Sequence, residues 1–548
     1  MKQGGRIMRL NKEGLQDRQW WLDRGYQLPE YDREAVAKAT KAHPVWIHFG
    51  VGNIFRAFMA EAAQKLLNQG LMGQGIIGAE GFDDEIIENV SRPCDDYSIA
   101  VTLCGDGSVK KSVTGSITRS LCLNRAKTGE FWQLEAVFSN PSLQMASFTI
   151  TEKGYSLSRE NALLPEVASD LKAGPKRSES YLGKVAALLY TRFKAGAYPL
   201  AMVSMDNCSH NGERLAHAME VFAKGWEENG LADRGFYSYV CISGKVTFPW
   251  TMIDKITPRP SDDVQKILEA DGLEGMTPVV TKKHTYVAPY VNAEESQYLV
   301  IEDAFPAGRP PLEKAGIIFT DRATVELTEQ MKVCTCLNPL HTALAIFGCL
   351  LGYEKICDEM KDEQLNALVR GIGYKEGLPA AADPGILKPV DFLDTVVDVR
   401  LPNPFMPDTP QRIATDTSQK LSIRFGGTIR AYMEDPGLDV HSLRLIPLVL
   451  AGWLRYLTGI DDKGNAMALS PDPVAKDIAP YVCGLEGQPA EMVMEKLSPV
   501  LKNTEIFGVD LFKAELAALV CQDFCAMNQG PGAVRQTLKD VLALAKEG

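Results

Sequence analysis

Short apolar runs alternate with helical patterns along the first part of the chain. The run VWIHFG (45–50) leads into glycines, and the stretch FRAFMAEAAQKLLNQG that follows carries apolar residues at helical spacing. The next apolar run is GIIGAE (75–80). A strand, a glycine turn, a helix and a second strand predict the opening of a βαβ unit.

Four further apolar runs predict strands, namely YSIAVTL (97–103), MASFTIT (145–151), YPLAMVSM (198–205) and FYSYVCIS (236–243). Because helical patterns separate several of them, we expect a mostly parallel sheet covered by helices.

The pattern changes at GRPPLEKAG (308–316), a junction rich in Pro and Gly, beyond which amphipathic helical patterns dominate. We therefore predict an α/β domain over residues 1–310, including an N-terminal extension, and a mainly α-helical domain over residues 311–548. A chain of 548 residues exceeds what one core usually supports.

The charge balance limits the possible partners. The formal net charge is −12 and the sequence pI is near 5.3, which argues against nucleic acid and anionic membranes, because both select a basic surface. No run reaches the roughly 18–20 apolar residues of a membrane span, and the N-terminus lacks a signal-peptide core. Twelve cysteines without a paired framework predict reduced thiols and a cytoplasmic protein. We expect a small-molecule partner and a monomer or small homo-oligomer.

The glycine turn is a candidate dinucleotide site. Small residues after the first strand let a backbone approach a pyrophosphate, and the N-terminus of the next helix favours its negative charge. With two glycines the signal is weak, and a tight turn without any ligand is an equal alternative. The candidate cofactor-binding residues of the turn are Gly50, Gly52, Asn53, Ile54, Phe55 and Arg56.

A carboxylate that binds the ribose is expected after the second strand. The segment EGFDDE (80–85) offers Glu80, Asp83 and Asp84 there, and the spacing alone does not choose among them. Carboxylates at this place would favour NAD over NADP, because they repel a 2′-phosphate.

Polar residues also interrupt three other stretches that otherwise look buried. Asp206 and Asn207 follow the predicted strand 198–205, Asp254 and Lys255 lie in FPWTMIDKITPRP (248–260), and the stretch 400–425 is dense in Pro, Arg, Asp and Lys. Each has a simpler interpretation: a helix cap or Asx-turn, a solvated pair, or surface charges at Arg400, Arg412 and Lys420.

The segment KVCTCLNPLHTAL (332–344) raises the question of a metal. Cys334 and Cys336 are too close for the usual zinc spacing, and no second pair lies nearby, so they are predicted to be small core residues. Asn338 before a proline predicts a helix start, with His341 in its first turn. A histidine there is often a core residue, whereas a lysine, an asparagine and a histidine at one site can move a proton and polarise a reacting oxygen. Lys332 can act as a base if burial lowers its pKa.

The ordered set HFGVGNIFRAF, SFTITEKGY, SMDNCSHNG, FPWTMIDKITP, YLVIEDAF, MKVCTCLNPLHTAL and RIATDTSQK resembles the long-chain polyol (mannitol) dehydrogenase family. The resemblance runs from about residue 45 to at least residue 420. It implies a Rossmann-type N-terminal domain, a helical C-terminal domain, NAD as the cofactor and chemistry without a metal.

The resemblance also implies roles for particular residues. Lys332 would be the general acid/base, Asn207 and Asn338 would polarise the reacting oxygen, and His341 would orient it. Substrate binding would fall to Asp254, Arg412 and Lys420.

Two features depart from the family pattern. Five residues rather than four separate Lys332 from Asn338. One extra residue would turn Lys332 by about 100° on a helix, so we predict a π-bulge or loop between them. The second departure is Phe55, which stands where many members have His.

The resemblance leaves the substrate open, because Arg412 and Lys420 match residues that occur in both polyol and hexuronate members. It is strongest to members that interconvert D-mannonate and D-fructuronate, and in that case Arg412 and Lys420 would help hold the substrate carboxylate. The alternatives are a mannitol-type polyol dehydrogenase, a tagaturonate reductase, and a more remote one, a non-catalytic NADH-binding sensor.

Overall fold

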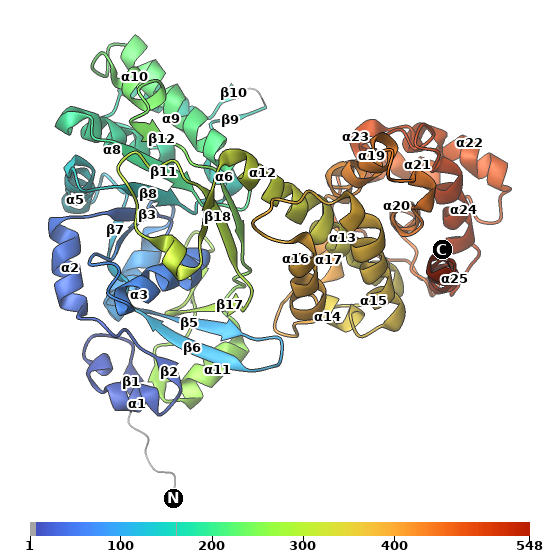
Figure 1. The fold of residues 1–548 in the computed structure, drawn as a ribbon, viewed down its shortest axis with the longest axis horizontal. Coiled ribbons are helices and arrows are strands. Elements are labelled where there is room, and N and C mark those ends of the chain that lie inside the picture. Colours follow the sequence, from blue (N-terminus) through green and yellow to red (C-terminus); the bar gives the residue numbers. More distant parts are fainter. Residues whose placement is uncertain (1–6, 161, 548) are drawn as a thin grey trace, which may run out of the picture. The chain divides into compact units, whose positions relative to one another are not determined.

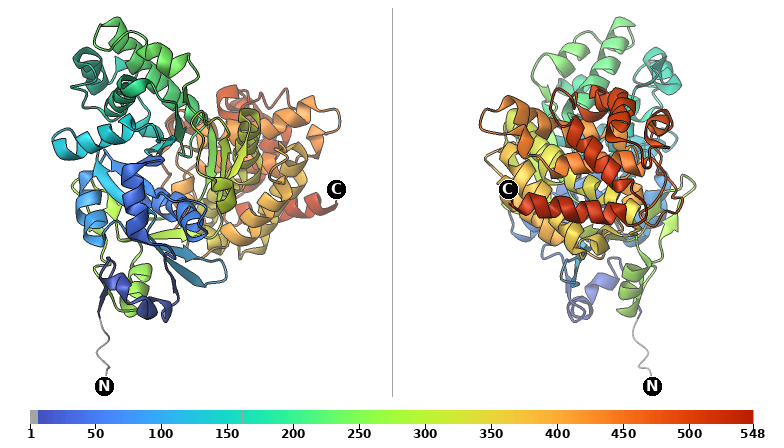
Figure 2. Two further views of the ribbon diagram at one scale, coloured as in Figure 1. Left: turned by 60° about the vertical axis from the view of Figure 1, so that its left-hand side comes forward. Right: turned by 90° about the vertical axis from the view of Figure 1, so that its right-hand side faces the viewer.

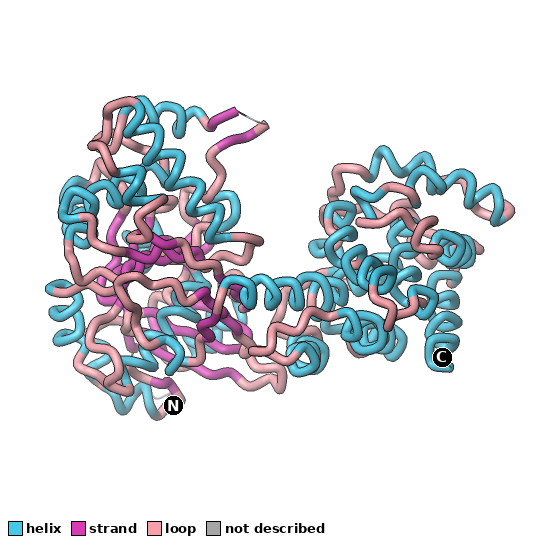
Figure 3. The backbone as a smooth tube through the Cα atoms, turned by 45° about the horizontal axis from the view of Figure 1, so that its top comes forward, coloured by secondary structure: helices cyan, strands magenta, loops and turns pink. Residues whose placement is uncertain are grey.

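A computed structural model describes residues 7–160 and 162–547. The chain forms two compact units, Met1–Glu326 and Leu327–Gly548. The division lies later than residue 310, because strand β19 (Ile318–Thr320) pairs with β18 (Tyr298–Glu302) and so stays with the first unit. Strands occur only in the first unit within the described part of the chain, as the magenta segments of Figure 3 show.

The first unit is built on a six-stranded sheet in which all neighbouring strands are parallel (Figure 1). The strand order is β12-β11-β8-β3-β4-β7. The chain passes from β3 to β4 on one side and later to β8 on the other, so the turn after β3 lies at the topological switch point of a Rossmann-type sheet. The bounds are β3 (Trp46–Phe49), β4 (Ile76–Glu80), β7 (Ile117–Cys122), β8 (Met145–Phe148), β11 (Leu200–Ser204) and β12 (Val246–Thr247).

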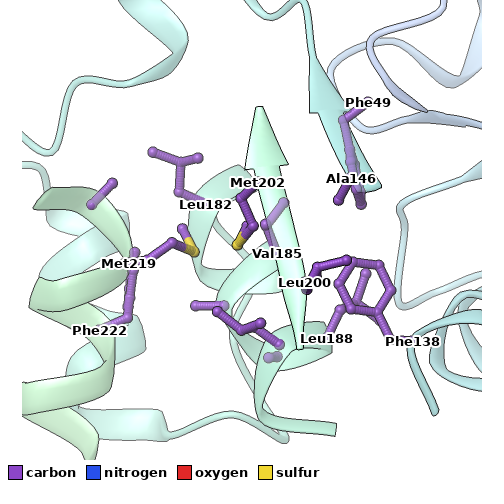
Figure 4. Close-up of a cluster of buried hydrophobic side chains, with 14 of the residues drawn as sticks. Phe49, Phe138, Ala146, Leu182, Val185, Leu188, Leu200, Met202, Met219 and Phe222 are labelled. Atoms are coloured by element: carbon purple, nitrogen blue, oxygen red, sulfur yellow. The ribbon is translucent and has the colours of Figure 1, made fainter. Parts of the chain in front are cut away.

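Helices cover this sheet and bury its apolar side chains. Burial of each large apolar side chain contributes about 1.5–3 kcal/mol. Figure 4 shows one such cluster, with Phe49, Phe138, Ala146, Leu182, Val185, Leu188, Leu200, Met202, Met219 and Phe222 in contact. The helices of the first unit are α1 (Arg18–Leu22), α2 (Arg33–Ala42), α3 (Ala60–Asn68), α4 (Asp84–Ile86), α5 (Thr128–Ser139), α6 (Thr151–Gly154), α7 (Pro165–Ala173), α8 (Tyr181–Gly196), α9 (Asn211–Glu228), α10 (Phe236–Cys241) and α11 (Asp262–Ala270).

One predicted strand is wrong. FYSYVCIS (236–243) forms helix α10, which begins after Gly235 in the left-handed region (φ 94°). Its buried residues Phe236, Tyr239 and Val240 are spaced three and four apart, so packing along one helix face overrides the β-propensity of the aromatic and branched side chains.

The remaining strands form smaller sheets. The predicted strand 97–103 is present as β5 but belongs to a four-stranded sheet, β17-β5-β6-β2, rather than to the parallel one. A three-stranded sheet has the order β13-β18-β19. The bounds are β2 (Tyr26–Gln27), β5 (Ser98–Leu103), β6 (Val109–Thr114), β13 (Thr251–Asp254) and β17 (Tyr290–Glu294), and the short pairs are β1 (Met8–Arg9) with β14 (Leu273–Glu274), β9 (Ser158–Arg159) with β10 (Ala162–Leu163), and β15 (Val279–Val280) with β16 (Tyr286–Val287).

The N-terminal extension completes the four-stranded sheet. Strand β2 adds to β6, and the Tyr26 hydroxyl donates to the Asp271 carboxylate at 2.7 Å. Lys111 Nζ lies 2.7 Å from the same carboxylate, and Trp21 is fully buried. The extension is thus a structural part of the first unit.

The regular elements described in the second unit are all helices, joined by loops (Figure 2, orange and red). Its central helices are α13 (Asn338–Leu351) and α20 (Leu445–Tyr456), and all residues of α20 are buried, as the apolar run 443–454 predicts. The others are α12 (Arg322–Gln330), which contains the boundary, α14 (Ile356–Glu359), α15 (Glu363–Arg370), α16 (Pro389–Thr395), α17 (Pro410–Ile413), α18 (Leu421–Arg424), α19 (Gly426–Glu434), α21 (Ala475–Val482), α22 (Ala490–Leu501), α23 (Thr504–Phe507), α24 (Ala517–Met527) and α25 (Ala533–Glu547).

One continuous helical stretch, Arg322–Leu351, is long and apolar enough to cross a membrane by composition, but 78% of its most apolar window is buried inside the structure. It is therefore a core helix of this fold. The twelve cysteines all carry free thiols, as the lack of a paired framework predicts.

Two glycines follow β3 and differ in their surroundings. Gly50 has a φ of 97°, and a Cβ built on it would lie 2.2 Å from the carbonyl oxygen of Thr149. A Cβ on Gly52 would meet nothing within 4 Å. The fold therefore requires glycine at position 50, whereas position 52 leaves open space beside the turn.

This difference predicts unequal effects of one substitution. Gly50→Ala should lower the free energy of unfolding by roughly 3 kcal/mol, because left-handed strain and a backbone clash add together. Gly52→Ala should change it by less than about 0.5 kcal/mol. Urea unfolding followed by circular dichroism measures both variants, and equal losses would contradict the structural role of Gly50.

Candidate functional site

The open space at Gly52 adjoins the start of a helix. The helical run begins at Asn53 and continues through the π-helical segment η2 (Phe55–Met59) into α3. The first amides of a helix lack partners within it and carry a partial positive charge. Main-chain groups of residues 52–55 therefore suit a pyrophosphate, and the absence of a Cβ at Gly52 leaves room for it.

The side chains that follow the glycine turn stabilise the turn from within the protein. Arg56 is 4% exposed and donates to the Ala288 carbonyl at 2.7 Å and to Asn53 Oδ1 at 3.0 Å; burial lowers its pKa to about 10. Phe55 is buried and stacks on His48 with ring centroids 3.9 Å apart. Ile54 is half-buried.

Glu80 joins the turns after β3 and β4. Its buried carboxylate accepts hydrogen bonds from the amides of Val51 (3.0 Å), Phe82 (2.8 Å) and Asp83 (3.2 Å), while desolvation raises its pKa. Asp83 is also buried; it accepts from Glu85 N at 3.2 Å and from the Thr281 hydroxyl at 2.5 Å. Glu80 and Asp83, two of the three candidate ribose carboxylates, thus have partners inside the protein, and their role toward a cofactor stays a prediction.

A pocket of about 360 Å³ opens beside these residues, at the carboxyl ends of β4 and β7. Its lining includes Asp84, which accepts from Asn124 Nδ2 at 2.7 Å and lies 3.4 Å from Lys127 Nζ. In a Rossmann-type sheet the adenosine ribose binds at the end of the second strand. The pocket is therefore the candidate adenosine site, and Figure 1 shows the sheet whose strand ends form it.

Asp206 and Asn207 have different surroundings after β11. Asp206 is 9% exposed and accepts from the amides of Ile150 (2.8 Å) and Thr151 (2.9 Å) and from the Tyr155 hydroxyl (2.6 Å). It therefore holds the turn after β8, where Thr151 has a φ of 64°. Asn207 is exposed, so it is the residue of this pair that the fold presents outward.

Asp254 ends strand β13 and is 5% exposed, so it is not one half of a solvated pair. The neighbouring Lys255 Nζ donates to the Glu294 carbonyl and to Gln297 Oε1, both at 2.9 Å. Burial of a carboxylate at a strand end is typical of a positioned polar group.

The second unit contains the other predicted residues, and the predicted bulge is confirmed. Met331–Cys336 is a π-helical segment, η6, in which Leu337 N donates to the Lys332 carbonyl at 3.1 Å. Helix α13 then begins at Asn338, with Pro339 in its first turn. Lys332 is 3% exposed. The extra residue is absorbed by the wider turn, and Lys332 lies inside the protein rather than in solvent.

The two cysteines of η6 behave as core residues. Cys336 is buried and Cys334 half-buried, and burial raises the pKa of both thiols, that of Cys336 to about 12. Since the thiolate is the metal ligand, this environment disfavours metal binding. The interpretation of the site as metal-independent stays a prediction.

His341 lies in a charged cluster one turn into α13. Its Nε2 is 3.7 Å from Asp408 Oδ2. Burial lowers the pKa of His341 to about 4; Asp408 opposes this shift, while Arg400, Arg424 and Arg412 add to it. The imidazole is therefore neutral at pH 7 and able to donate or accept one hydrogen bond at each nitrogen.

The arginines come from three different segments. Arg400 ends the π-helical segment η9 (Val396–Arg400) and is 5% exposed, so it is not a surface charge. Arg412 forms an ion pair with the buried Asp408. Arg424 Nη1 donates to the Thr342 hydroxyl at 2.5 Å, and burial lowers its pKa to about 10. Sequence reasoning missed Asp408 and Arg424, although both lie in the polar stretch 400–425.

Lys420 faces carbonyl groups at the end of α17. Its ammonium donates to the Thr415 carbonyl and to the Ile413 carbonyl, the latter at 3.4 Å. Burial lowers its pKa, and the neighbouring Arg424 acts in the same direction. Lys420 thus stabilises the loop that carries Arg412, and direct substrate binding by Lys420 stays a prediction.

Two sequence families match the chain. The mannitol dehydrogenase Rossmann domain matches residues 45–314, and the mannitol dehydrogenase C-terminal domain matches residues 324–528. Together they cover most of both units.

The similarity to individual relatives extends over most of the chain. D-mannonate oxidoreductase of Thermotoga maritima is 50% identical over 538 residues, which cover 98% of this chain and 99% of the relative. Polyol:NADP oxidoreductase of Gluconobacter oxydans is 31% identical over 459 residues, or 81% and 85% of the two chains. A solved structure, Pseudomonas fluorescens mannitol 2-dehydrogenase in a ternary complex with NAD and D-mannitol, is similar with a TM-score of 0.68 and 27% identity over 98% and 100% of the chains.

The lowered pKa of His341 predicts how stability depends on pH. Between pH 6.5 and about 4 the unfolded histidine binds a proton that the folded one does not, so the free energy of unfolding should fall as the pH falls through this window, by up to about 1.4 kcal/mol per unit. His341→Gln should flatten this slope in urea unfolding at pH 4.5 to 7. His217→Gln, on an exposed position of α9, is the control. An unchanged slope in His341→Gln would contradict the buried neutral state.

Proposed function

The chain belongs to the mannitol dehydrogenase family, and we propose that it interconverts D-fructuronate and D-mannonate with NAD(H) and without a metal ion. The T. maritima relative, half identical over nearly the full length, is named for D-mannonate oxidation. We also propose a cytoplasmic location, which the twelve free thiols favour.

The observation that carries the substrate proposal is the cationic cluster at His341. Arg400, Arg412 and Arg424 all act on this histidine, and Asp408 is the carboxylate among them. An anionic substrate suits such a cluster, because guanidinium groups bind carboxylates in a bidentate manner. A neutral polyol carries no charge for these guanidinium groups to bind.

The glycine turn fits the cofactor. Open space at Gly52 and the amides of the first helical turn suit a pyrophosphate. When bound, the nicotinamide supplies or accepts the hydride. The protein must then exclude water, hold the sugar acid and move one proton.

Lys332 is the proposed proton carrier. In the direction of reduction the keto oxygen becomes an alkoxide and takes a proton from the Lys332 ammonium; in oxidation the neutral amine takes the hydroxyl proton. Asn338 begins the helix after η6, and its amide would donate to the developing oxyanion. The family resemblance also assigns a second amide donor, Asn207, to this reaction and Asp254 to substrate binding. The neutral His341 would orient the oxygen by one hydrogen bond.

Four alternatives differ from this proposal in their chemistry. A mannitol-type enzyme would prefer fructose, and a tagaturonate reductase would prefer the epimeric keto acid. A non-catalytic sensor would bind NADH without turnover; the burial of Lys332 in η6 favours the enzyme over it. Loss of activity with a strong chelator would indicate a metal-dependent enzyme instead.

The substrate is tested by NADH oxidation with D-fructuronate, D-tagaturonate and D-fructose side by side. D-fructuronate should give the highest kcat/KM. Arg412→Ala should raise KM for D-fructuronate about 10- to 100-fold, since a hydrogen bond between charged groups contributes about 1.5–3 kcal/mol, and should change KM for D-fructose far less. A preference for fructose, or an unaffected KM for the keto acid, would overturn carboxylate recognition.

The role of Lys332 is tested by Lys332→Met, which keeps the volume of the buried side chain. The turnover number should fall by about 10²- to 10⁴-fold, the range for loss of a general acid/base, while NADH binding measured by fluorescence titration persists. Lys476→Ala, an exposed lysine on α21, is the matched control and should keep full activity. A variant that retains more than about a tenth of the activity would exclude Lys332 as the proton carrier.

A further inference from the structure

Arg424 differs from the two predicted carboxylate ligands of the second unit in having no anionic or carbonyl partner. Arg412 pairs with the Asp408 carboxylate, and the Lys420 ammonium donates to two carbonyl groups. Among the residues that the structure describes, Arg424 has one hydrogen-bond partner, the neutral Thr342 hydroxyl, and no ion pair. The protein therefore leaves the charge of Arg424 uncompensated.

The free atoms of Arg424 form the edge of the guanidinium that suits a carboxylate. Nη1 donates to the Thr342 hydroxyl at 2.5 Å, and this hydroxyl donates to the Asn338 carbonyl at 2.9 Å. Nε and Nη2 have no acceptor among the described residues, and both retain contact with solvent. These two atoms lie on one edge of the planar group, where their parallel N–H bonds match the two oxygens of a carboxylate.

The surroundings of this edge are positively charged and partly buried. Arg424 N donates to the Lys420 carbonyl at 2.9 Å, so the two cations lie one turn apart on the same side of a short helical segment. Burial lowers the pKa of Arg424 to about 10 and also lowers that of Lys420, which the charge of Arg424 lowers further. An anion at the free edge would offset both effects, because it stabilises the charged form of each group.

We propose that Arg424 is the specificity-determining residue of the second unit, and that its Nε and Nη2 bind the carboxylate of the sugar acid side-on. The inference rests on the proposed keto-acid reductase function and extends it by naming the ligand of the substrate's charge. Arg412 and Lys420, which already have partners in the protein, are secondary ligands. Thr342 holds the third nitrogen of the guanidinium, so the free edge is oriented before the substrate binds.

The test compares two ligands that differ in charge, D-mannonate and the neutral D-mannonamide, as inhibitors of NADH oxidation with D-fructuronate. The wild-type chain should bind D-mannonate at least about tenfold tighter than the amide, the factor that corresponds to one hydrogen bond between charged groups. Arg424→Gln should bring this ratio toward one and raise KM for D-fructuronate about 10- to 100-fold. The turnover number should change far less, because a carboxylate remote from the reacting carbon is held equally in the ground and transition states.

Three further variants distinguish a ligand from a structural support. Arg424→Lys keeps the charge without the two-pronged edge and should give an intermediate ratio; it also serves if Arg424→Gln fails to fold. Thr342→Val removes the hydroxyl that holds Nη1 and should retain most of the ratio. Arg430→Gln is the matched control, since Arg430 is an exposed arginine of α19 that donates to the Gly508 carbonyl at 2.7 Å.

The outcomes separate this inference from the proposed function. An unchanged ratio in Arg424→Gln, with normal turnover of D-fructuronate, would overturn Arg424 as the ligand and leave the proposed function intact. An equal loss of the ratio in Thr342→Val would also overturn it, because Arg424 would then act only by supporting α13. A wild-type chain that binds the acid and the amide equally and prefers D-fructose would overturn the proposed function as well.

Discussion

One extra residue between Lys332 and Asn338 constrains the second unit more than any other local feature. An α-helix would carry Lys332 about 100° away from the side that Asn338 and His341 share. The π-helical segment Met331–Cys336 absorbs the residue, and Lys332 is buried while α13 keeps its regular start. π-Bulges are often found at functional sites, because they arise from insertions that change which side chains face inward. The proton chemistry proposed for this enzyme depends on that local change of helix type.

The first unit relies on a comparable constraint at the switch point of its sheet. Gly50 adopts a backbone conformation that only glycine tolerates beside Thr149, and Glu80 binds the amides of the turns after β3 and β4. These contacts use side chains to fix main-chain groups, so the amides after Gly52 remain available to a ligand. A carboxylate that sequence position assigns to the cofactor thus also holds the protein backbone.

Buried charge underlies the proposed substrate specificity. In the second unit the charges of Arg400, Arg412 and Arg424 act on a neutral histidine, and one buried carboxylate, Asp408, pairs with Arg412. Charge is costly away from water, so a partly buried cationic cluster favours a ligand of opposite charge. A sugar carboxylate is an anion that suits this place.

The sequence by itself determined the parallel sheet, the glycine turn at its switch point, the helical second unit and the need for a break before Asn338, because each depends on local periodicity or on a count of residues. The order of the motifs along the sequence also indicated the family. Only the tertiary structure decided that 236–243 is a helix, that Glu80 binds the turn, and that Asp408, Arg400 and Arg424 gather at His341. Packing across segments distant in the chain overrides local propensity, and burial decides which charges are neutralised and which stay available; neither is encoded in the spacing of a single stretch.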